Sequence, residues 1–214
     1  MRKAITLVEL TIVILIISLL SALINGALGI IKSAKTRDYI NNIREYENSY
    51  YSFYSIYSGF PGDLSNASYF WPTSLNGNGD SIIKYEVGDA SEEFANAWVH
   101  LALGDFVMTP YGPLEFPTSN NDLVSYVLRY YDNLYNLMGN SITLQSPAFA
   151  GVLTPVEAYQ LDCKIDNCEP DVGEMVIING NGVTASETSC LNETNKLNTK
   201  NVVTSECRAV MFFD

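Results

Sequence analysis

One glycine-rich stretch carries three oxygen-bearing side chains in alternating positions. They are Asn76, Asn78 and Asp80, and a glycine separates each from the next. Calcium loops place oxygen ligands at every second residue, so this spacing predicts a calcium site. The sequence points to no other cofactor or metal.

The second half of such a calcium loop does not follow. The position where a loop glutamate would stand is Val87. A carboxylate from elsewhere would have to complete the site, and Glu92 and Glu93 are the candidates. An ordinary glycine-rich turn is the alternative interpretation.

Residues for catalysis are scarce. The chain has one histidine, His100, which we place at the polar edge of a predicted helix. Asp162, Asp166 and Asp171 form a second acidic group, which we interpret as exposed turn acids. No nucleophile elbow, zinc-protease helix or phosphate-binding loop is found in the sequence. We therefore predict that the protein is not an enzyme.

The charge balance restricts the partners. From Phe60 onward the chain has 20 acidic and 6 basic residues. Nucleic-acid binding depends on lysines and arginines that contact phosphates, so this acidity argues against a nucleic-acid partner.

Four cysteines lie in the last third of the chain. An even number is typical of disulfides in an exported protein. Three pairings are possible, and we favour Cys190 with Cys207 and Cys163 with Cys168. A zinc site is the alternative, but the sequence has no CxxC motif.

The start of the chain has a different chemistry. Arg2 and Lys3 precede an apolar segment whose residues 10–31 carry no charge. As a helix, these residues would extend about 33 Å, enough to cross the roughly 30 Å core of a bilayer. Glu9 is an acid at the front of this segment. Because a lone carboxylate is costly to bury in a bilayer, we expect Glu9 to have a function. A plain signal-anchor helix with an incidental Glu9 is the alternative.

The residues Ala4-Ile5-Thr6-Leu7-Val8-Glu9 resemble the processing site of type IV pilins and of type II secretion pseudopilins. The resemblance implies that a prepilin peptidase cuts a leader, residues 1–4, between Ala4 and Ile5. Ile5 would become the methylated amino terminus. Glu9 would pair with the amino terminus of a neighbouring subunit in a helical filament.

The physical chemistry agrees with this assignment. An amine and a carboxylate are each costly to bury alone and less costly as a pair, so the pair would favour one axial register. The sequence departs from the family at two positions, where Ala4 replaces the commoner glycine and Ile5 the commoner phenylalanine.

Beyond the apolar segment the helical pattern continues. Tyr39, Ile43, Tyr46, Tyr50, Phe53 and Tyr57 recur at steps of three and four, which predicts one buried helix face. Gly59 and Pro61 then give a stop signal.

The rest of the chain mixes helix and strand signals. We predict helices over 91–103 (with Ser91 as N-cap), over 121–138 and from Thr154, strands over 174–179 and 208–213, and a hairpin turn at Asn179-Gly180 or Asn181-Gly182. A second resemblance, to a subset of pseudopilin-like proteins, rests on four short segments. They are Phe60-Pro61-Gly62-Asp63, residues 76–80, Glu92-Glu93 with Trp98–Leu101, and residues 161–166.

The expected fold is α+β and pilin-like. A long helix over about 5–58 has a membrane-spanning front half (about 5–31) and an amphipathic rear half (about 32–58). A small globular head, residues 59–214, contains an antiparallel sheet. The resemblance implies a structural subunit, a minor one, of a type IV pilus or a type II secretion pseudopilus.

Such a subunit would stay in the bacterial inner membrane, with its head in the periplasm or outside the cell, until it joins other pilin-like subunits. The alternative function is a membrane-anchored or filament-tip adhesin whose acidic head binds a ligand.

Overall fold

The computed structural model describes residues 7–85, 93–108, 115–119, 123–180, 189–192, 194–198, 204 and 206–213, apart from the side chains of 24–28. The chain divides into two compact units, Met1–Asp38 and Tyr39–Asp214. The predicted leader and Ile5 lie outside the described residues.

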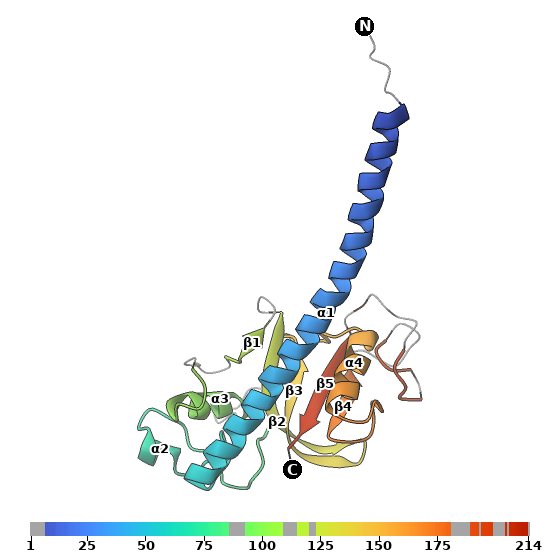
Figure 1. The fold of residues 1–214 in the computed structure, drawn as a ribbon. Coiled ribbons are helices and arrows are strands. Elements are labelled where there is room, and N and C mark those ends of the chain that lie inside the picture. The colour runs from blue at the N-terminus through green and yellow to red at the C-terminus, as the bar shows by residue number, and fades with distance from the viewer. Residues whose placement is uncertain are drawn as a thin grey trace. The chain divides into compact units, whose positions relative to one another are not determined.

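The first element is the helix α1, Leu7–Tyr57 (Figure 1). Its bounds agree with the helix predicted over about 5–58. The helix ends where the glycine–proline signal was expected, because Ser58 has a left-handed φ of 54° and Gly59 follows. The long N-terminal helix of the predicted fold is therefore confirmed.

In the unit Met1–Asp38 the described apolar side chains of α1 face outward all round the helix. Leu7 is 78% exposed and Leu15 67%. Three hydroxyl groups in this part, those of Thr11, Ser18 and Ser21, donate to carbonyl oxygens three or four residues earlier. These bonds satisfy the hydroxyls within the helix itself. Among the described residues, no helix has the combined length and hydropathy needed to cross a membrane.

The unit Tyr39–Asp214 is built on one antiparallel sheet. Its strand order is β1-β2-β3-β5-β4, so the last strand in the sequence lies between β3 and β4. The strands are β1 (Thr118–Ser119), β2 (Val124–Leu134), β3 (Leu137–Gln145), β4 (Met175–Asn179) and β5 (Cys207–Phe212). An α+β fold with an antiparallel sheet is therefore confirmed.

The rear half of α1 packs on one face of this sheet. Tyr50 stacks on Phe213 with ring centroids 4.3 Å apart. The Asn140 amide donates to the Tyr50 hydroxyl, and the Asn42 amide donates to the Tyr126 hydroxyl. The predicted stripe supplies this contact, since Tyr39, Ile43, Tyr50 and Phe53 are buried and Tyr46 and Tyr57 are partly buried.

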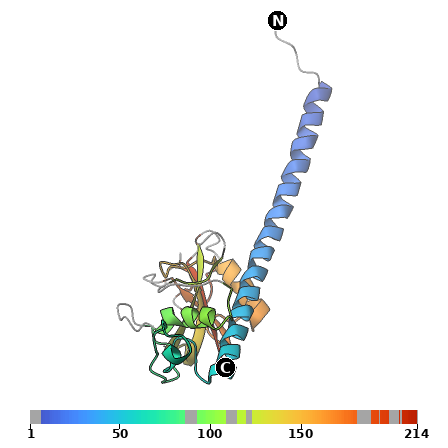
Figure 2. The same cartoon turned by 90° about the vertical axis from the view of Figure 1, so that its left-hand side faces the viewer.

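The described residues of this unit also form three shorter helices. They are α2 (Ala67–Phe70), α3 (Glu93–Leu103) and α4 (Pro155–Ile165). The rear turns of α1 lie on the same side of the sheet as α4 (Figure 2). The helix α3 confirms the prediction over 91–103, although Ser91 lies outside the described residues. For α4, Thr154 is the N-cap of a capping box with Glu157, as Thr154 and Pro155 predict.

The helix predicted over 121–138 is wrong. The structure has β2, the turn and the start of β3 there. Val124 to Leu128 are all buried, so both faces of the strand are covered and the alternation of a half-exposed strand is lost. Apolar residues three and four apart then imitate a helix, and only the tertiary context decides the structure.

Of the two predicted hairpin turns, the one at Asn179-Gly180 is wrong. The tight turn joins β2 to β3 through Tyr135 and Asn136, both with positive φ, as a two-residue type I′ loop requires. Asn179 instead ends β4 and pairs with Cys207, so Asn179-Gly180 is not a hairpin turn. Asn181-Gly182 lies outside the described residues. The strands predicted over 174–179 and 208–213 are confirmed as β4 and β5.

Both favoured disulfides are present. Cys163 pairs with Cys168 after α4, and Cys190 pairs with Cys207 at the start of β5. All four cysteines are therefore paired, and the zinc alternative for them is wrong.

Candidate functional site

The predicted assembly residue Glu9 lies in the first turn of α1. A carboxylate is favourable there, because the first turn of a helix presents unpaired backbone N–H groups and a partial positive charge. The side chain of Glu9 is exposed, and so are those of its apolar neighbours Leu7, Val8 and Leu10. The processing residues Ala4 and Ile5 lie outside the described residues.

The predicted calcium stretch is organised by an aspartate from another turn. Asp63 is 3% exposed and its carboxylate accepts three backbone N–H groups of that stretch. The donors are Gly79 at 2.6 Å, Asp80 at 3.2 Å and Ser81 at 2.8 Å. Asp63 therefore fixes the backbone of the loop around Asp80.

Glu93 holds the same loop from the start of α3. Its two carboxylate oxygens accept the backbone N–H groups of Asn78 at 3.2 Å and Lys84 at 3.0 Å. Glu93 is buried, with 5% of its surface exposed. The two acids thus join three segments, namely the turn after α1, the glycine-rich loop and α3.

The carboxylates of Asp63, Asp80 and Glu93 form one acidic cluster, with potential ligand atoms within 4.8 Å of one another. Burial raises the pKa of both Asp63 and Glu93, and the nearby acids add to the rise. The exposed Lys84 ammonium lies 3.9 Å from Asp80 and is the cation that pairs with the cluster. Carboxylate oxygens are the ligands that Ca²⁺ prefers, so this cluster is the candidate cation site of the head.

The two predicted asparagine ligands are placed differently from Asp80. The Asn76 side-chain oxygen accepts the backbone N–H of Ser68. Asn78 forms hydrogen bonds with Asp80, through its amide to the carboxylate and through its oxygen to the backbone N–H. Of the two external carboxylates considered, Glu93 lies in the cluster, and Glu92 lies outside the described residues.

His100 braces the same region from the interior. It is fully buried, so its prediction at a polar helix edge is wrong. Its Nδ1 accepts the backbone N–H of Gly62 at 2.9 Å, and its Nε2 lies 3.0 Å from the carbonyl oxygen of Leu75. Burial lowers the pKa of His100, which favours the neutral ring that these two bonds require. The histidine has a structural role here.

Gly62 explains why this turn is so tight. Its φ is +87°, a conformation that favours glycine. A Cβ at this position would also clash with the carbonyl oxygen of Glu93. The sequence Gly62-Asp63 therefore sets the turn directly against the first residue of α3.

The second acidic group is not an exposed set of turn acids. Asp162, on α4, has no exposed surface, and neither of its carboxylate oxygens has a hydrogen-bond partner among the described residues. Burial raises the pKa of Asp162 to about 6, and Asp166 and Glu169 add to the rise. Asp166 and Asp171 are partly buried.

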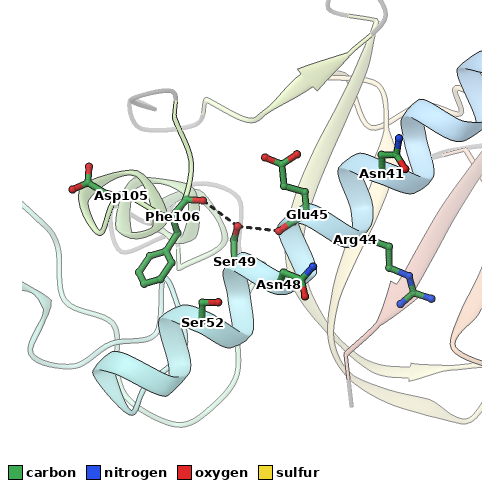
Figure 3. A pocket seen from close by; sticks show the side chains of 8 residues that line it. All are labelled: Asn41, Arg44, Glu45, Asn48, Ser49, Ser52, Asp105 and Phe106. Carbon is green, nitrogen blue, oxygen red and sulfur yellow. Dashed lines mark hydrogen bonds between the residues drawn. The ribbon is translucent and has the colours of Figure 1, made fainter.

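A polar hollow of about 580 Å³ lies beside the rear half of α1. Figure 3 shows Ser49 on its wall, donating to the carbonyl oxygens of Glu45 and Phe106. The hollow is lined by Asn41, Arg44, Glu45, Asn48, Ser49, Ser52, Asp105 and Phe106. Hydroxyl groups and carboxylates stand among these residues, and no histidine or cysteine does.

Sequence reasoning missed Asp63 as a member of the site. A signal was present, because Asp63 follows a Pro-Gly turn and precedes a loop with many backbone N–H groups free of regular structure. The buried Asp162 had no such signal, since the sequence does not show which side of α4 is covered.

Comparisons of the chain with protein-family models, with curated proteins and with solved structures found no match.

Proposed function

We propose that this protein is a structural subunit, a minor one, of a type IV pilus or type II secretion pseudopilus. The observation that carries the proposal is the exposed apolar surface of α1. Ten of its described apolar residues between Leu7 and Leu19 are at least 48% exposed: Leu7, Val8, Leu10, Ile12, Val13, Ile14, Leu15, Ile16, Ile17 and Leu19. A patch of this extent marks a surface that another apolar partner covers.

The nature of the partner follows from the shape of the patch. A helix that is apolar on all sides is normally surrounded, either by lipid or by other helices. The hydroxyls of Thr11, Ser18 and Ser21 already donate to the helix backbone, so the segment brings few unmet polar groups into such surroundings. In the proposed mechanism, residues 5–31 are held in the inner membrane and then move into the filament core.

Glu9 gives the assembly its register. Cleavage between Ala4 and Ile5 would create an amino terminus four residues before Glu9. The carboxylate of one subunit and the amine of the next would then neutralise each other in an apolar core, where either charge alone is costly.

The disulfides and the core of the head support this proposal. The head has two disulfides, an expected feature of a domain outside the reducing cytoplasm. The part of α1 from Tyr39 onward belongs to the core of the head. A membrane-anchored or tip adhesin remains the alternative function.

Mass spectrometry of the N-terminal peptide tests the processing. We expect the mature protein to begin at Ile5 with an N-methyl group. An intact Met1, or a mature terminus near Ala27, would contradict the filament proposal.

Glu9 variants test assembly separately. We expect Glu9→Gln and Glu9→Ala to insert in the membrane normally and to be largely lost from sheared filament fractions, because both remove the charge that selects the register. Ser18→Ala is a matched control on the same helix and should be incorporated normally. Wild-type incorporation of both Glu9 variants would remove the role proposed for this residue.

A further inference from the structure

The face of the sheet opposite α1 carries a buried band of polar side chains. Side chains alternate along a strand, and Tyr126, Leu128, Ile142 and Leu144 belong to the core shared with α1. Their neighbours therefore face the other way. Those neighbours include Ser125, Ser141, Thr143 and Gln145, each no more than 1% exposed.

Arg129, on β2, belongs to the same face. Its guanidinium carbon lies 3.9 Å from the ring centroid of Tyr85 and 4.3 Å from that of Tyr131. The rings of Tyr85 and Tyr131 thus both contact the Arg129 guanidinium. The Tyr131 hydroxyl lies 3.3 Å from the Thr143 hydroxyl. The Nε of Arg129 is buried and has no hydrogen-bond partner among the described residues.

Arg208, on β5, is the second guanidinium of this face. Its Nε donates to the carbonyl oxygen of Asn179 at 3.0 Å, and its Nη1 makes a long 3.4 Å bond to the side-chain oxygen of Gln145. The Gln145 amide nitrogen is buried without a partner among the described residues. The Asn179 and Gln145 contacts hold Arg208 over β3.

Arg129 and Arg208 are like charges on strands that flank β3. Burial lowers the pKa of Arg208, and the charge of Arg129 lowers it further, while Tyr131 and Tyr85 raise it. The head has 20 acidic and only 6 basic residues, and two of the six lie on this face of the sheet. The ion pairs within the described part of the chain are Arg44–Glu47 and Lys84–Asp80, so neither Arg129 nor Arg208 is neutralised there.

We propose that Arg129 and Arg208 bind an oxyanion, a carboxylate or phosphate group, on the face of β2, β3 and β5 opposite α1. A guanidinium presents its donors in a planar fork that matches two oxygens of such a group. The rings of Tyr85 and Tyr131 hold the Arg129 guanidinium in place, and Gln145 positions that of Arg208. The Gln145 amide nitrogen, which has no partner among the described residues, is a further donor for the anion. The anion ends the repulsion between the two cations.

Inorganic phosphate is the first probe. Full-length protein in detergent is titrated with phosphate at constant ionic strength, with chloride as the exchanged ion. At about five times Kd, ligand linkage should raise the Tm by about 2–4 °C, and the effect should saturate. In the same titration the Arg Nε–H signals of Arg129 and Arg208 should shift in nuclear magnetic resonance spectra.

Variants locate the effect. Arg129→Gln and Arg208→Gln should each abolish the phosphate-dependent rise in Tm. Arg208→Lys keeps the charge without the fork and should retain only part of it. Arg44→Gln is the matched control, because Arg44 is already paired with Glu47, and it should respond like the wild type.

A second arm identifies the source of the oxyanion. If an Asp or Glu side chain of another copy occupies the site, the two Arg Nε–H signals will shift with protein concentration in the absence of phosphate. A response to phosphate in dilute protein assigns the site to a free anion. Wild-type Arg signals that move in neither arm, or a phosphate effect that persists in both Gln variants, would overturn the proposal. The wild-type spectra decide the matter even if a variant fails to fold.

Discussion

The head gathers like charges in two regions, and it treats them in opposite ways. In the acidic cluster, the carboxylates of Asp63 and Glu93 accept five hydrogen bonds from backbone N–H groups. On the face opposite α1, Arg129 and Arg208 have two aromatic rings, one carbonyl oxygen and one amide oxygen between them. The negative charges are therefore well solvated by the chain, and the positive charges are not.

The difference follows from what each surrounding backbone has to offer. An irregular loop has many N–H groups that no ladder uses, so it can solvate a carboxylate. The carbonyl oxygens of a central strand already accept hydrogen bonds from N–H groups of the neighbouring strands, so an arginine above them finds few acceptors. We therefore interpret the acidic cluster, whose carboxylates the chain already hydrogen-bonds, as structural in the first place. We interpret the arginine pair, which has few partners, as a binding site.

The largest expected effect comes from breaking the solvated cluster. Asp63→Ala removes the acceptor of three backbone N–H groups, and we expect it to lower the free energy of unfolding by about 2–4 kcal/mol. Asp63→Asn keeps one acceptor oxygen and should cost less. Urea unfolding followed by circular dichroism measures both, with the exposed Asp132→Asn as control. Equal stabilities for Asp63→Ala and Asp132→Asn would refute the bracing role of Asp63.

The second prediction concerns Asp162, a buried acid whose carboxylate has no hydrogen-bond donor among the described residues. Its pKa of about 6 lies above the ordinary value of 3.8, so the fold favours the protonated form. The stability that this gives is complete below pH 3.8 and is lost as the pH rises through 6.

We therefore expect Asp162→Asn to raise the free energy of unfolding at pH 8 by about 1–2 kcal/mol and to change it little at pH 3.5. Urea unfolding across this pH range measures the difference. Parallel pH profiles for the wild type and the variant would show that Asp162 is ionised in the fold at neutral pH.

The smallest expected effect concerns calcium at the acidic cluster. If Asp63, Asp80 and Glu93 hold Ca²⁺, adding it after chelation should raise the Tm by about 2–4 °C. Asp80→Asn should abolish this rise, and Asp132→Asn should keep it. No rise in the wild type would leave the glycine-rich loop as a turn that Asp63 and Glu93 hold by themselves.

Local signals in the sequence predicted most of the fold. The apolar spacing of α1, the Thr154–Pro155 start of α4 and the polar loop between Cys190 and Cys207 each act within a short stretch of chain. The strand β2 could not be predicted this way, because its burial on both faces depends on segments that lie far away in the sequence.

The candidate sites were predicted less well for the same reason. Asp80 stands in a recognisable spacing, but its neighbours Asp63 and Glu93 reach it from two other segments. Arg129 and Arg208 are 79 positions apart and give no local pattern at all. Their place on one face of the sheet follows only from the pairing of β3 with both β2 and β5.

The position of β5 also bears on the order in which the protein can be made. Among the described strands it is the last in the sequence, yet it lies between β3 and β4 and carries the cysteine that pairs with Cys190. The five-stranded sheet therefore cannot close until β5 has been synthesised. The Cys190–Cys207 disulfide likewise forms only after β5 has been synthesised, because its second cysteine begins that strand.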